Sequence, residues 1–309
     1  MIGSLNMDLV VRCAALPQAG QTVVGRDFFT APGGKGANQA VAAARLGARV
    51  RMAGCVGRDA FGPALVASLR DAGVDAAAVT AVDGPTGTAL ITVDAAGHNT
   101  IVVVPGANAA CDAALVDRAL VRAGGPGILL LQHEIPEAAN ARAIRAARQA
   151  GWSVMLNPAP ARPVPPELLQ LIDVVAPNAS EAAAITGHAV ATRADALAAA
   201  RALCAMGARA AVVTLGGDGS VCCDAAGAWH CPAVSVAAVD TTAAGDAFIG
   251  ALAVALAEGR ELAHGLGVAA AAAALAVTRL GAQPSLASSA ELAAFIARHG
   301  VPTAQAFDG

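Results

Sequence analysis

Short apolar runs rich in β-branched residues alternate along this sequence with alanine-rich segments of helical spacing, and this alternation limits the folds open to the chain. The clearest runs are residues 128–131, 153–156, 174–176 and 211–214, each separated from the next by a predicted helix. Strands that alternate with helices form parallel sheets covered on both faces. The sequence therefore predicts an α/β fold with a doubly wound, mostly parallel sheet.

Two stretches depart from this alternation, because they are rich in β-forming residues and contain no predicted helix. They are residues 12–30 and residues 87–104, and the second has an Asp-Ala-Ala-Gly turn at 94–97. Such runs predict hairpin strands in a small second sheet. No linker rich in Pro, Ser or charge divides the chain, so we expect one domain over residues 1–309, with this sheet as a lid over a site at the strand ends.

Composition excludes several classes of function. The 309 residues carry a formal net charge of -3 and only 14% of them are charged, so the chain lacks the basic field needed for non-specific nucleic-acid binding. The longest apolar runs, 247–257 and 266–277, are shorter than the ~20 residues of a membrane span. The N-terminus lacks the regions of a secretory signal. We expect a cytoplasmic protein that binds neither nucleic acid nor membrane.

The seven cysteines are irregularly spaced and include no Cys-x-x-Cys pair. This pattern fits neither a disulfide framework nor a zinc site, so buried free thiols are expected. Cys222 and Cys223 are neighbours in a predicted strand, where successive side chains point to opposite faces. At most one of them faces any given site.

The segment 33–40 reads Gly-Gly-Lys-Gly-Ala-Asn-Gln-Ala, contains the only lysine of the chain, and precedes a predicted helix that ends at Gly47. Glycines before a helix let a polyol approach the backbone closely, and Lys35 and Asn38 can hydrogen-bond its hydroxyls. The segment matches neither a Walker A loop nor Gly-x-Gly-x-x-Gly. A structural turn is the alternative interpretation.

The segment 240–248 reads Asp-Thr-Thr-Ala-Ala-Gly-Asp-Ala-Phe and opens a long apolar helix. Small residues at a helix N-terminus leave backbone N–H groups unpaired, and these can hold the charge that develops on a transferring phosphoryl group. Asp246 can take a proton from an attacking hydroxyl. The alternative is that Asp246 only caps the helix.

Two further segments complete a candidate nucleotide site. Asn178 and Glu181 open a helix after the run at 174–176, and a glycine-rich turn spans 214–219. Glu181 could organise Mg²⁺ through water, and the turn could bind phosphates and adenosine through backbone N–H groups. Helix capping and a hairpin turn are the respective alternatives.

In their order along the chain and in their residues, these segments resemble the ribokinase family, the PfkB-type carbohydrate kinases, along nearly the whole chain. The resemblance rests on segments 3–8, 33–40, 105–108, 157–161, 240–246 and 281–285. It implies a Rossmann-like, ribokinase-like α/β core with a small β-sheet lid, and a homodimer through the lid sheets. It also implies transfer of the ATP γ-phosphoryl group to the 5-hydroxyl of D-ribose, which gives D-ribose 5-phosphate and ADP.

The resemblance also implies roles for individual residues. Asp246 matches the catalytic base, and the anion hole matches Ala243, Ala244 and Gly245. The positions that bind the sugar match Asn6, Asp8, Gly34, Lys35, Asn38, Glu134 and Asp246. The positions for ATP and Mg²⁺ match Asn178, Glu181, Thr214, Gly216, Gly219 and Gly245. A monovalent cation, K⁺, is implied beside the anion hole at Asp240, Thr242, Ala276, Arg279, Gly281 and Ser285.

Three features depart from the family. The chain begins within the expected first core strand, most of which we expect to be missing. His133 stands before Glu134 at a position that is apolar in a typical ribokinase, and we interpret it as a packing variant. Ala270 replaces a side chain that can line the adenine pocket, which loosens the expected selectivity for the nucleotide.

Other functions stay open or are disfavoured. A related kinase for 2-deoxyribose, another pentose or hexose, or a nucleoside is the nearest alternative, since one hydroxyl separates ribose from 2-deoxyribose. A non-catalytic sugar-binding relative is disfavoured, because a binder does not need both halves of a phosphoryl-transfer site. A dinucleotide-dependent oxidoreductase is disfavoured by the lack of a Gly-x-Gly-x-x-Gly fingerprint after an early strand.

Overall fold

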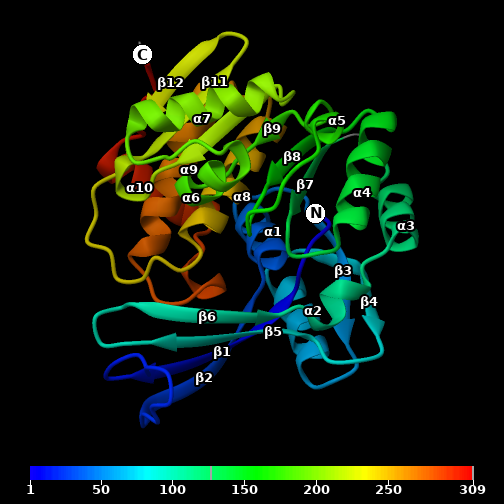
Figure 1. Cartoon of the computed structure of the whole chain (residues 1–309). Helices are drawn as coiled ribbons and strands as arrows, with labels where there is room; N and C mark the ends of the chain where they lie inside the picture. Colours follow the sequence, from blue (N-terminus) through cyan, green and yellow to red (C-terminus); the bar gives the residue numbers. More distant parts are fainter. Residues whose placement is uncertain (126, 308–309) are drawn as a thin grey trace.

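The computed structural model describes residues 1–125 and 127–307, which form a layered α/β core with a separate sheet beneath it (Figure 1). The main sheet has the strand order β13-β12-β11-β10-β9-β8-β7. Its strands are β7 (Ile128–Gln132), β8 (Ser153–Asn157), β9 (Val174–Val175), β10 (Ala210–Thr214), β11 (Ser220–Asp224), β12 (Gly227–Cys231) and β13 (Gln305–Ala306). β7 to β10 are parallel and the remaining pairs are antiparallel. The α/β fold with a doubly wound sheet that the sequence predicted is confirmed, and three of the six strand pairs in this sheet are parallel.

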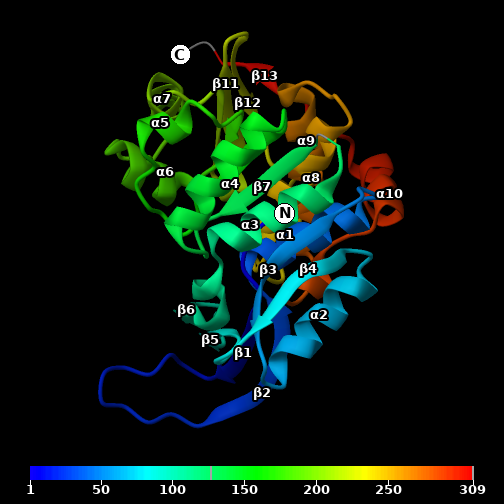
Figure 2. The ribbon, with the colours of Figure 1, turned by 90° about the vertical axis from the view of Figure 1, so that its right-hand side faces the viewer.

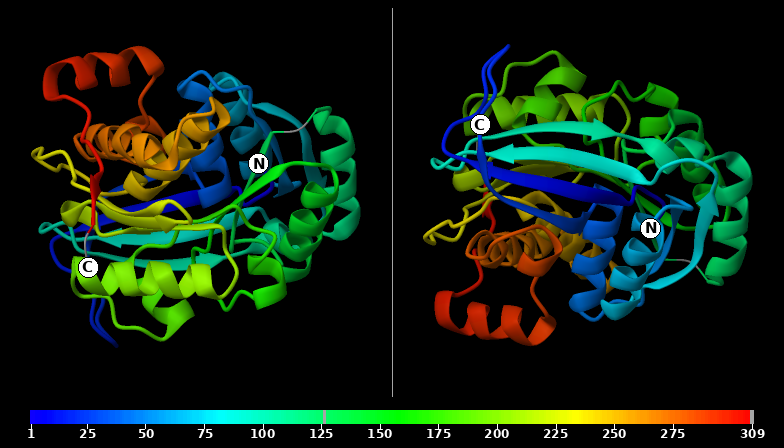
Figure 3. Two further views of the ribbon diagram at one scale, coloured as in Figure 1. Left: turned by 90° about the horizontal axis from the view of Figure 1, so that it is seen from above. Right: turned by 90° about the horizontal axis from the view of Figure 1, so that it is seen from below.

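Helices cover both faces of this sheet, and the views in Figure 3 show them on opposite sides. One face packs against α3 (Ala113–Ala123), α4 (Glu137–Gln149), α5 (Pro166–Leu169), α6 (Ala179–Thr186) and α7 (Arg193–Ala205). The other face packs against α8 (Ala244–Ala257), α9 (Leu262–Val277) and α10 (Ser289–His299). Because neighbouring strand residues alternate between the faces, Cys223 lies in the first layer and Cys222 in the second, as predicted.

A third cluster of buried side chains joins the two halves of the molecule. It contains α1 (Lys35–Arg45), α2 (Phe61–Asp71) and the parallel strand pair β3 (Arg51–Gly57) and β4 (Asp75–Val82). Between β3 and β7 lie the first residues of the chain: the Ile2 amide donates to Leu130, and the Gly3 amide donates to Ala53. These residues form an isolated bridge with β3 where the family resemblance led us to expect a reduced strand.

The second sheet has the strand order β2-β1-β5-β6 and lies below the core in Figures 1 and 2. Its strands are β1 (Asn6–Cys13), β2 (Gly25–Gly33), β5 (Gly87–Val93) and β6 (Asn99–Val104). β1 begins before residues 12–30, the stretch in which the sequence predicted strands. At its start, the polar Asn6 and Asp8 alternate with Leu5 and Met7, which pack into the third cluster. The strand therefore carries polar side chains on one face at its start.

Within the described part of the chain, no helix combines the length and apolar character needed to cross a bilayer.

Candidate active site

The candidate residues gather at one edge of the main sheet, where the parallel strands end. Glu134 follows β7, Asn157 ends β8, Asn178 follows β9 and Thr214 ends β10. Loops at the carboxyl ends of parallel strands form the ligand-binding crevice of open α/β sheets. The first turns of α1 and α8, two helices in contact, face the same region.

The glycine loop before α1 is held in a backbone conformation that a side chain would disturb. Gly34 has φ 89°, and a Cβ added there would lie 2.7 Å from the Asn6 amide nitrogen. The Lys35 amide then donates to Glu134 (N···Oε2 3.0 Å), and the Ser4 hydroxyl donates to the same oxygen (2.5 Å). The loop is thus a structural turn and also a contact between β1, α1 and the end of β7.

Asp8 and Lys35 form the charged centre of this cluster. Burial, together with the smaller effect of the nearby carboxylates of Glu134 and Asp246, raises the pKa of Asp8 to about 7. Burial opposes the charge of Lys35, but attraction to Asp246, Glu134 and Glu181 outweighs burial and holds its pKa above the ordinary value. The only lysine therefore lies among three acidic groups that come from three separate segments.

Asp246 occupies the first turn of α8 with its side chain directed at α1. The Asn38 amide donates to one carboxylate oxygen (Nδ2···Oδ2 2.9 Å), and the Gln39 amide donates to the other (Nε2···Oδ1 2.9 Å). The N-cap of α8 is Ala243, which has no side-chain cap and the positive φ of 61°. Asp246 is thus paired with polar side chains of a second helix and does not serve as the N-cap.

Gln39 is a site residue that our reading of the sequence did not single out. Its Nε2 also donates to Asn157 (3.0 Å), and its Oε1 accepts from Gln132 (2.6 Å). Gln39 and Gln132 are both fully buried. In the sequence, the signal for Gln39 was a polar residue followed by Ala-Val-Ala-Ala-Ala in a helix with mostly small buried residues. A buried amide in such a helix needs hydrogen-bond partners from elsewhere.

Two amide oxygens of this network have no partner among the described residues: Oε1 of Gln132 and Oδ1 of Asn38. Asn38 is only 6% exposed, and its Nδ2 donates to Asp246. A buried amide oxygen without a hydrogen bond is costly to a fold. A hydroxyl donor in the crevice would satisfy it.

The candidate nucleotide residues lie together, and the structural alternatives for them are also realised. Asn178 and Glu181 form a reciprocal capping box at the start of α6, with both hydrogen bonds at 2.9 Å. Asn178 also bridges to Thr214, and the Thr214 amide donates to Pro177. After Thr214, the turn η2 (Gly216–Asp218) links the antiparallel β10 and β11.

Gly219 ends this turn at φ 87°, where a Cβ would lie 2.1 Å from a backbone oxygen of β12. By contrast, open space surrounds the positions where side chains would begin at Gly216 and Gly245. Burial raises the pKa of Glu181, although its hydrogen bonds within the capping box oppose that shift. The turn and the α8 N-terminus therefore both leave room for a ligand beside backbone N–H groups.

Asp240 connects the two loops that carry the candidate cation ligands. Its carboxylate accepts from the amides of Thr242 and Gly281, both at 2.8 Å. Burial opposes ionisation of Asp240, but these hydrogen bonds outweigh it and lower its pKa. The remaining members of the predicted shell lie on the second loop and its approach: Ala276, Arg279 and Ser285. Ser285 is fully buried, and its hydroxyl donates to the Ala282 carbonyl (2.8 Å).

The two departures noted beside the site are both buried. His133 lies 3.3 Å from the Pro160 carbonyl (Nδ1···O), and burial lowers its pKa to about 4, with a further contribution from the charge of Arg162. Ala270 packs in the α8 and α9 layer. Neither residue takes part in the hydrogen bonds around Asp246.

The layered α/β core thus places an acidic residue at a helix N-terminus, against the helix that follows the glycine loop. A family model described as pfkB family carbohydrate kinase matches residues 1–289. The chain therefore belongs to the pfkB family of carbohydrate kinases, and it is an enzyme that transfers a phosphoryl group to an alcohol.

Individual relatives narrow this assignment to the ribokinases. The ribokinase of Schizosaccharomyces pombe is 40% identical over 303 residues, which cover 94% of this chain and 95% of that protein. The structure of ribokinase from Thermotoga maritima has a TM-score of 0.86 at 36% identity, with 96% and 98% of the two chains covered. The structure of Arabidopsis thaliana ribokinase complexed with ribose and ATP has a TM-score of 0.86 at 34% identity, with 96% and 97% covered.

Proposed function

We propose that this enzyme transfers the γ-phosphoryl group of ATP to the 5-hydroxyl of D-ribose, giving D-ribose 5-phosphate and ADP. The observation that carries the proposal is the position of Asp246, which lies at the N-terminus of α8 and against the side chains of the glycine-loop helix. The relative from Arabidopsis that holds ribose and ATP supports both substrates. Because the reaction consumes ATP, we place it in the cytoplasm.

Ribose binds, in this proposal, between the start of β1 and the start of α1. Ionised Asp8 accepts hydrogen bonds from two neighbouring hydroxyls, because a carboxylate offers acceptor sites on both oxygens. The unpaired Asn38 Oδ1 accepts from another hydroxyl. Asn6, Lys35 and Glu134 complete the site, and Gly34 lets the sugar approach the backbone.

Asp246 acts as the base, and the first turn of α8 acts as the anion hole. As the 5-hydroxyl attacks the γ-phosphorus, its proton passes to the Asp246 carboxylate, and the bond from phosphorus to the β-γ bridging oxygen breaks. Negative charge on the transferring group is stabilised by backbone N–H groups of Ala243, Ala244 and Gly245 at the positive end of the helix dipole. The open space at Gly245 leaves room for that group.

ATP binds along the ends of β9 and β10. The turn from Thr214 to Gly219 binds the nucleotide through backbone groups, with Asn178 beside it. The described residues contain no cluster of three or more His, Cys, Asp or Glu side chains that could hold a metal ion. Mg²⁺ keeps several waters and binds through substrate phosphates, so Glu181 would hold the metal through one of its waters. When bound, the metal would supply charge neutralisation for the phosphates.

K⁺ would be held between the loops that Asp240 connects. Its ligands would be carbonyl, carboxylate and hydroxyl oxygens of Asp240, Thr242, Ala276, Arg279, Gly281 and Ser285. Oxygen-only sets suit hard cations. The residues present therefore fit a monovalent cation that orders the loop leading into Ala243, without contact to the substrate.

The second sheet acts as the lid of a single-domain enzyme and as its dimer interface. From the strand register, the face opposite Asp8 carries Phe28, Leu90, Val102 and Val104, all of them exposed in one copy. β6 is also the edge strand of its sheet. A second copy of the same apolar face would cover it, which supports a homodimer through the lid sheets.

ADP release from Mg-ATP and D-ribose tests this function, with K⁺ present or replaced by Na⁺ or Cs⁺. We expect K⁺-dependent release, reduced by at least about 1000-fold in Asp246→Asn while the variant still binds ribose. Because a related kinase is the alternative function, 2-deoxyribose, other sugars and nucleosides are assayed in parallel. ADP release with one of these compounds but not with ribose would refute ribose as the substrate, while phosphoryl transfer from ATP would stand. Ribose binding without ADP release in the wild type would refute the chemistry.

A further inference from the structure

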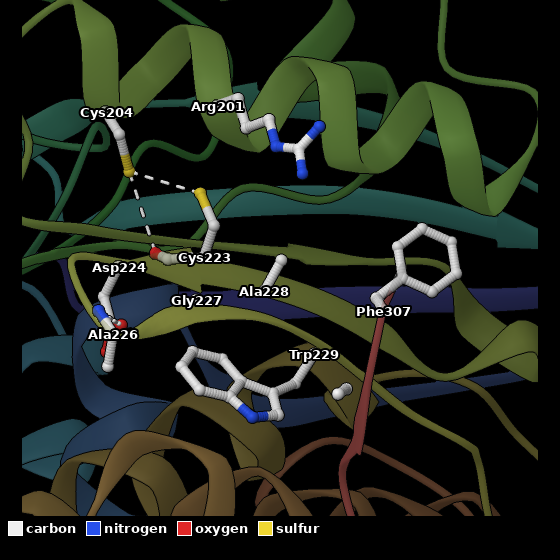
Figure 4. A pocket seen from close by; sticks show the side chains of 10 residues that line it. Arg201, Cys204, Cys223, Asp224, Ala226, Gly227, Ala228, Trp229 and Phe307 are labelled. Carbon is white, nitrogen blue, oxygen red and sulfur yellow. Dashed lines mark hydrogen bonds between the residues drawn. The ribbon is translucent and has the colours of Figure 1, made fainter. Parts of the chain in front are cut away.

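A groove at the end of the core farthest from the second sheet contains two adjacent thiols that the kinase reaction does not use. The groove has a volume of about 550 Å³, and its walls include Arg201 and Cys204 on α7, Cys223 on β11, Trp229 on β12, and Phe307 (Figure 4). The Sγ atoms of Cys204 and Cys223 lie 3.3 Å apart. We propose that these cysteines are a thiol–disulfide exchange site at which a low-molecular-weight disulfide oxidises the pair to a Cys204–Cys223 disulfide.

The two thiols differ in access, which assigns a role to each. Cys204 is half-buried in the last turn of α7, whereas Cys223 is 5% exposed on the sheet beneath it. A reagent in the groove therefore reaches Cys204 first. Cys223 also lines the groove, but it is less exposed, and its sulfur lies 3.3 Å from the Cys204 sulfur.

The charges around the thiols support the same order. The hydrogen bond between the two thiols lowers the pKa of Cys204, and that same contact, together with burial, raises the pKa of Cys223. A thiolate is the attacking species in exchange, so the more accessible Cys204 is also the better nucleophile. Arg201 lies one helical turn before Cys204 and is exposed, whereas the Asp224 carboxylate, which also lines the groove, opposes negative charge on Cys204.

The reaction balances without any group from the active site. The Cys204 thiolate attacks one sulfur of R–S–S–R, forms a mixed disulfide and releases R–S⁻, which takes up the proton lost by Cys204. Cys223 then loses its proton and attacks the Cys204 sulfur, which releases the second R–S⁻ as R–SH. Two protein thiols are oxidised to one disulfide, and one R–S–S–R is reduced to two R–SH. The sulfurs need to approach each other by about 1.3 Å to reach the length of an S–S bond.

A second pair of cysteines in the same protein is a built-in control. Cys55 and Cys111 also lie near each other, and the influence of Cys111 lowers the pKa of Cys55. Their exposures are 1% and 3%, and neither lines the groove. If proximity alone decided oxidation, both pairs would react. If access from the groove decides it, only Cys204 and Cys223 react.

The test uses the folded, full-length protein and glutathione disulfide as the probe. After incubation the sample is denatured, free thiols are alkylated with N-ethylmaleimide, and peptides are mapped without reduction. We expect two fewer alkylated cysteines and a peptide linking Cys204 to Cys223, with Cys55 and Cys111 still alkylated. Cys223→Ser should retain one glutathionyl group on Cys204, and in Cys204→Ser the Cys223 thiol should stay free.

Full alkylation of Cys204 and Cys223 in the treated wild type would overturn the proposal, and this measurement needs no variant that folds poorly. Equal formation of a Cys55–Cys111 link would overturn the argument from access. A Cys223→Ser protein without an adduct, but with the wild-type melting temperature, would overturn the assignment of Cys204 as the attacking thiol. None of these readouts depends on kinase activity, so the proposal stands or falls apart from the proposed function.

Discussion

Asp8 is the residue at which stability and function oppose each other most clearly, and Asp8→Asn separates them. The carboxyl is 8% exposed and lies near two other acidic groups, Glu134 and Asp246. An amide has almost the same shape and carries no charge. We expect the variant to unfold less readily at pH 8 than the wild type and to use ribose poorly.

The size of the effect follows from the pKa of Asp8, which is raised from 3.8 to about 7. When the pKa of a carboxyl is higher in the folded state than in the unfolded state, the carboxyl does not reduce stability below the unfolded pKa. Stability is then lost as the pH rises from the unfolded pKa through the folded pKa. At about 1.4 kcal/mol per pH unit, the raised pKa of Asp8 costs the fold about 4 kcal/mol at pH 8 and less than half of that at pH 5, where Asp8 is still protonated in the folded state. The advantage of the variant should therefore be about 2.5 kcal/mol larger at pH 8 than at pH 5.

Urea unfolding of both proteins at pH 5 and pH 8, without sugar, measures this difference, and Asp27→Asn on the exposed β2 strand is the matched control. Initial rates with ribose at pH 8 measure the function. The loss of two hydrogen bonds to a charged acceptor should lower kcat/KM for ribose by about 100-fold or more. An Asp8→Asn advantage that is equal at the two pH values, or absent, would refute the argument that burial and neighbouring carboxylates raise the pKa of Asp8.

Three further predictions test other parts of the structure. Gln39→Leu should lower kcat by about 10- to 100-fold and change KM for ribose much less, because it removes a donor that orients the candidate base; steady-state kinetics would contradict this if KM alone changed. Gly34→Ala should destabilise the fold by several kcal/mol more than Gly73→Ala, since both glycines have positive φ but only Gly34 meets backbone atoms; equal melting temperatures would refute the close-approach argument. Val102→Glu should convert the proposed dimer to a monomer in light scattering, whereas Val121→Glu on α3 should not; a dimer in both would exclude this lid face as the interface.

The core strands could be predicted from the sequence because their composition and their environment agree. The β-branched runs that became β7 to β10 are buried on both faces, so apolar character and strand propensity favour the same structure. β4 shows the opposite case. It reads Asp-Ala-Ala-Ala-Val-Thr-Ala-Val, and alanine favours a helix in isolation. Parallel pairing with β3 overrides that preference, and no local pattern announces the pairing.

Within the site, sequence reasoning located the segments better than the partners of individual side chains. Asp246 and Asn38 belong to segments whose glycines and small residues stand out, and the structure places the two side chains in contact. Gln39 lies next to Asn38, but its partners Asn157 and Gln132 come from two different strands. Only the packing of α1 across the ends of β7 and β8 brings these amides together, so their hydrogen bonds cannot be deduced from spacing.

The contrast between Glu181 and Asp246 shows why local pattern and function must be weighed separately. Both are acidic residues in the first turn of a helix, where either can interact favourably with the helix N-terminus. Glu181 completes a capping box, so its position is explained by α6 whether or not a nucleotide binds. Asp246 has no such local explanation, because its carboxylate is held by amides of another helix at considerable cost in burial. An acid that the local structure does not require is the stronger candidate for chemistry, and for this reason the proposed reaction depends on Asp246 rather than on Glu181.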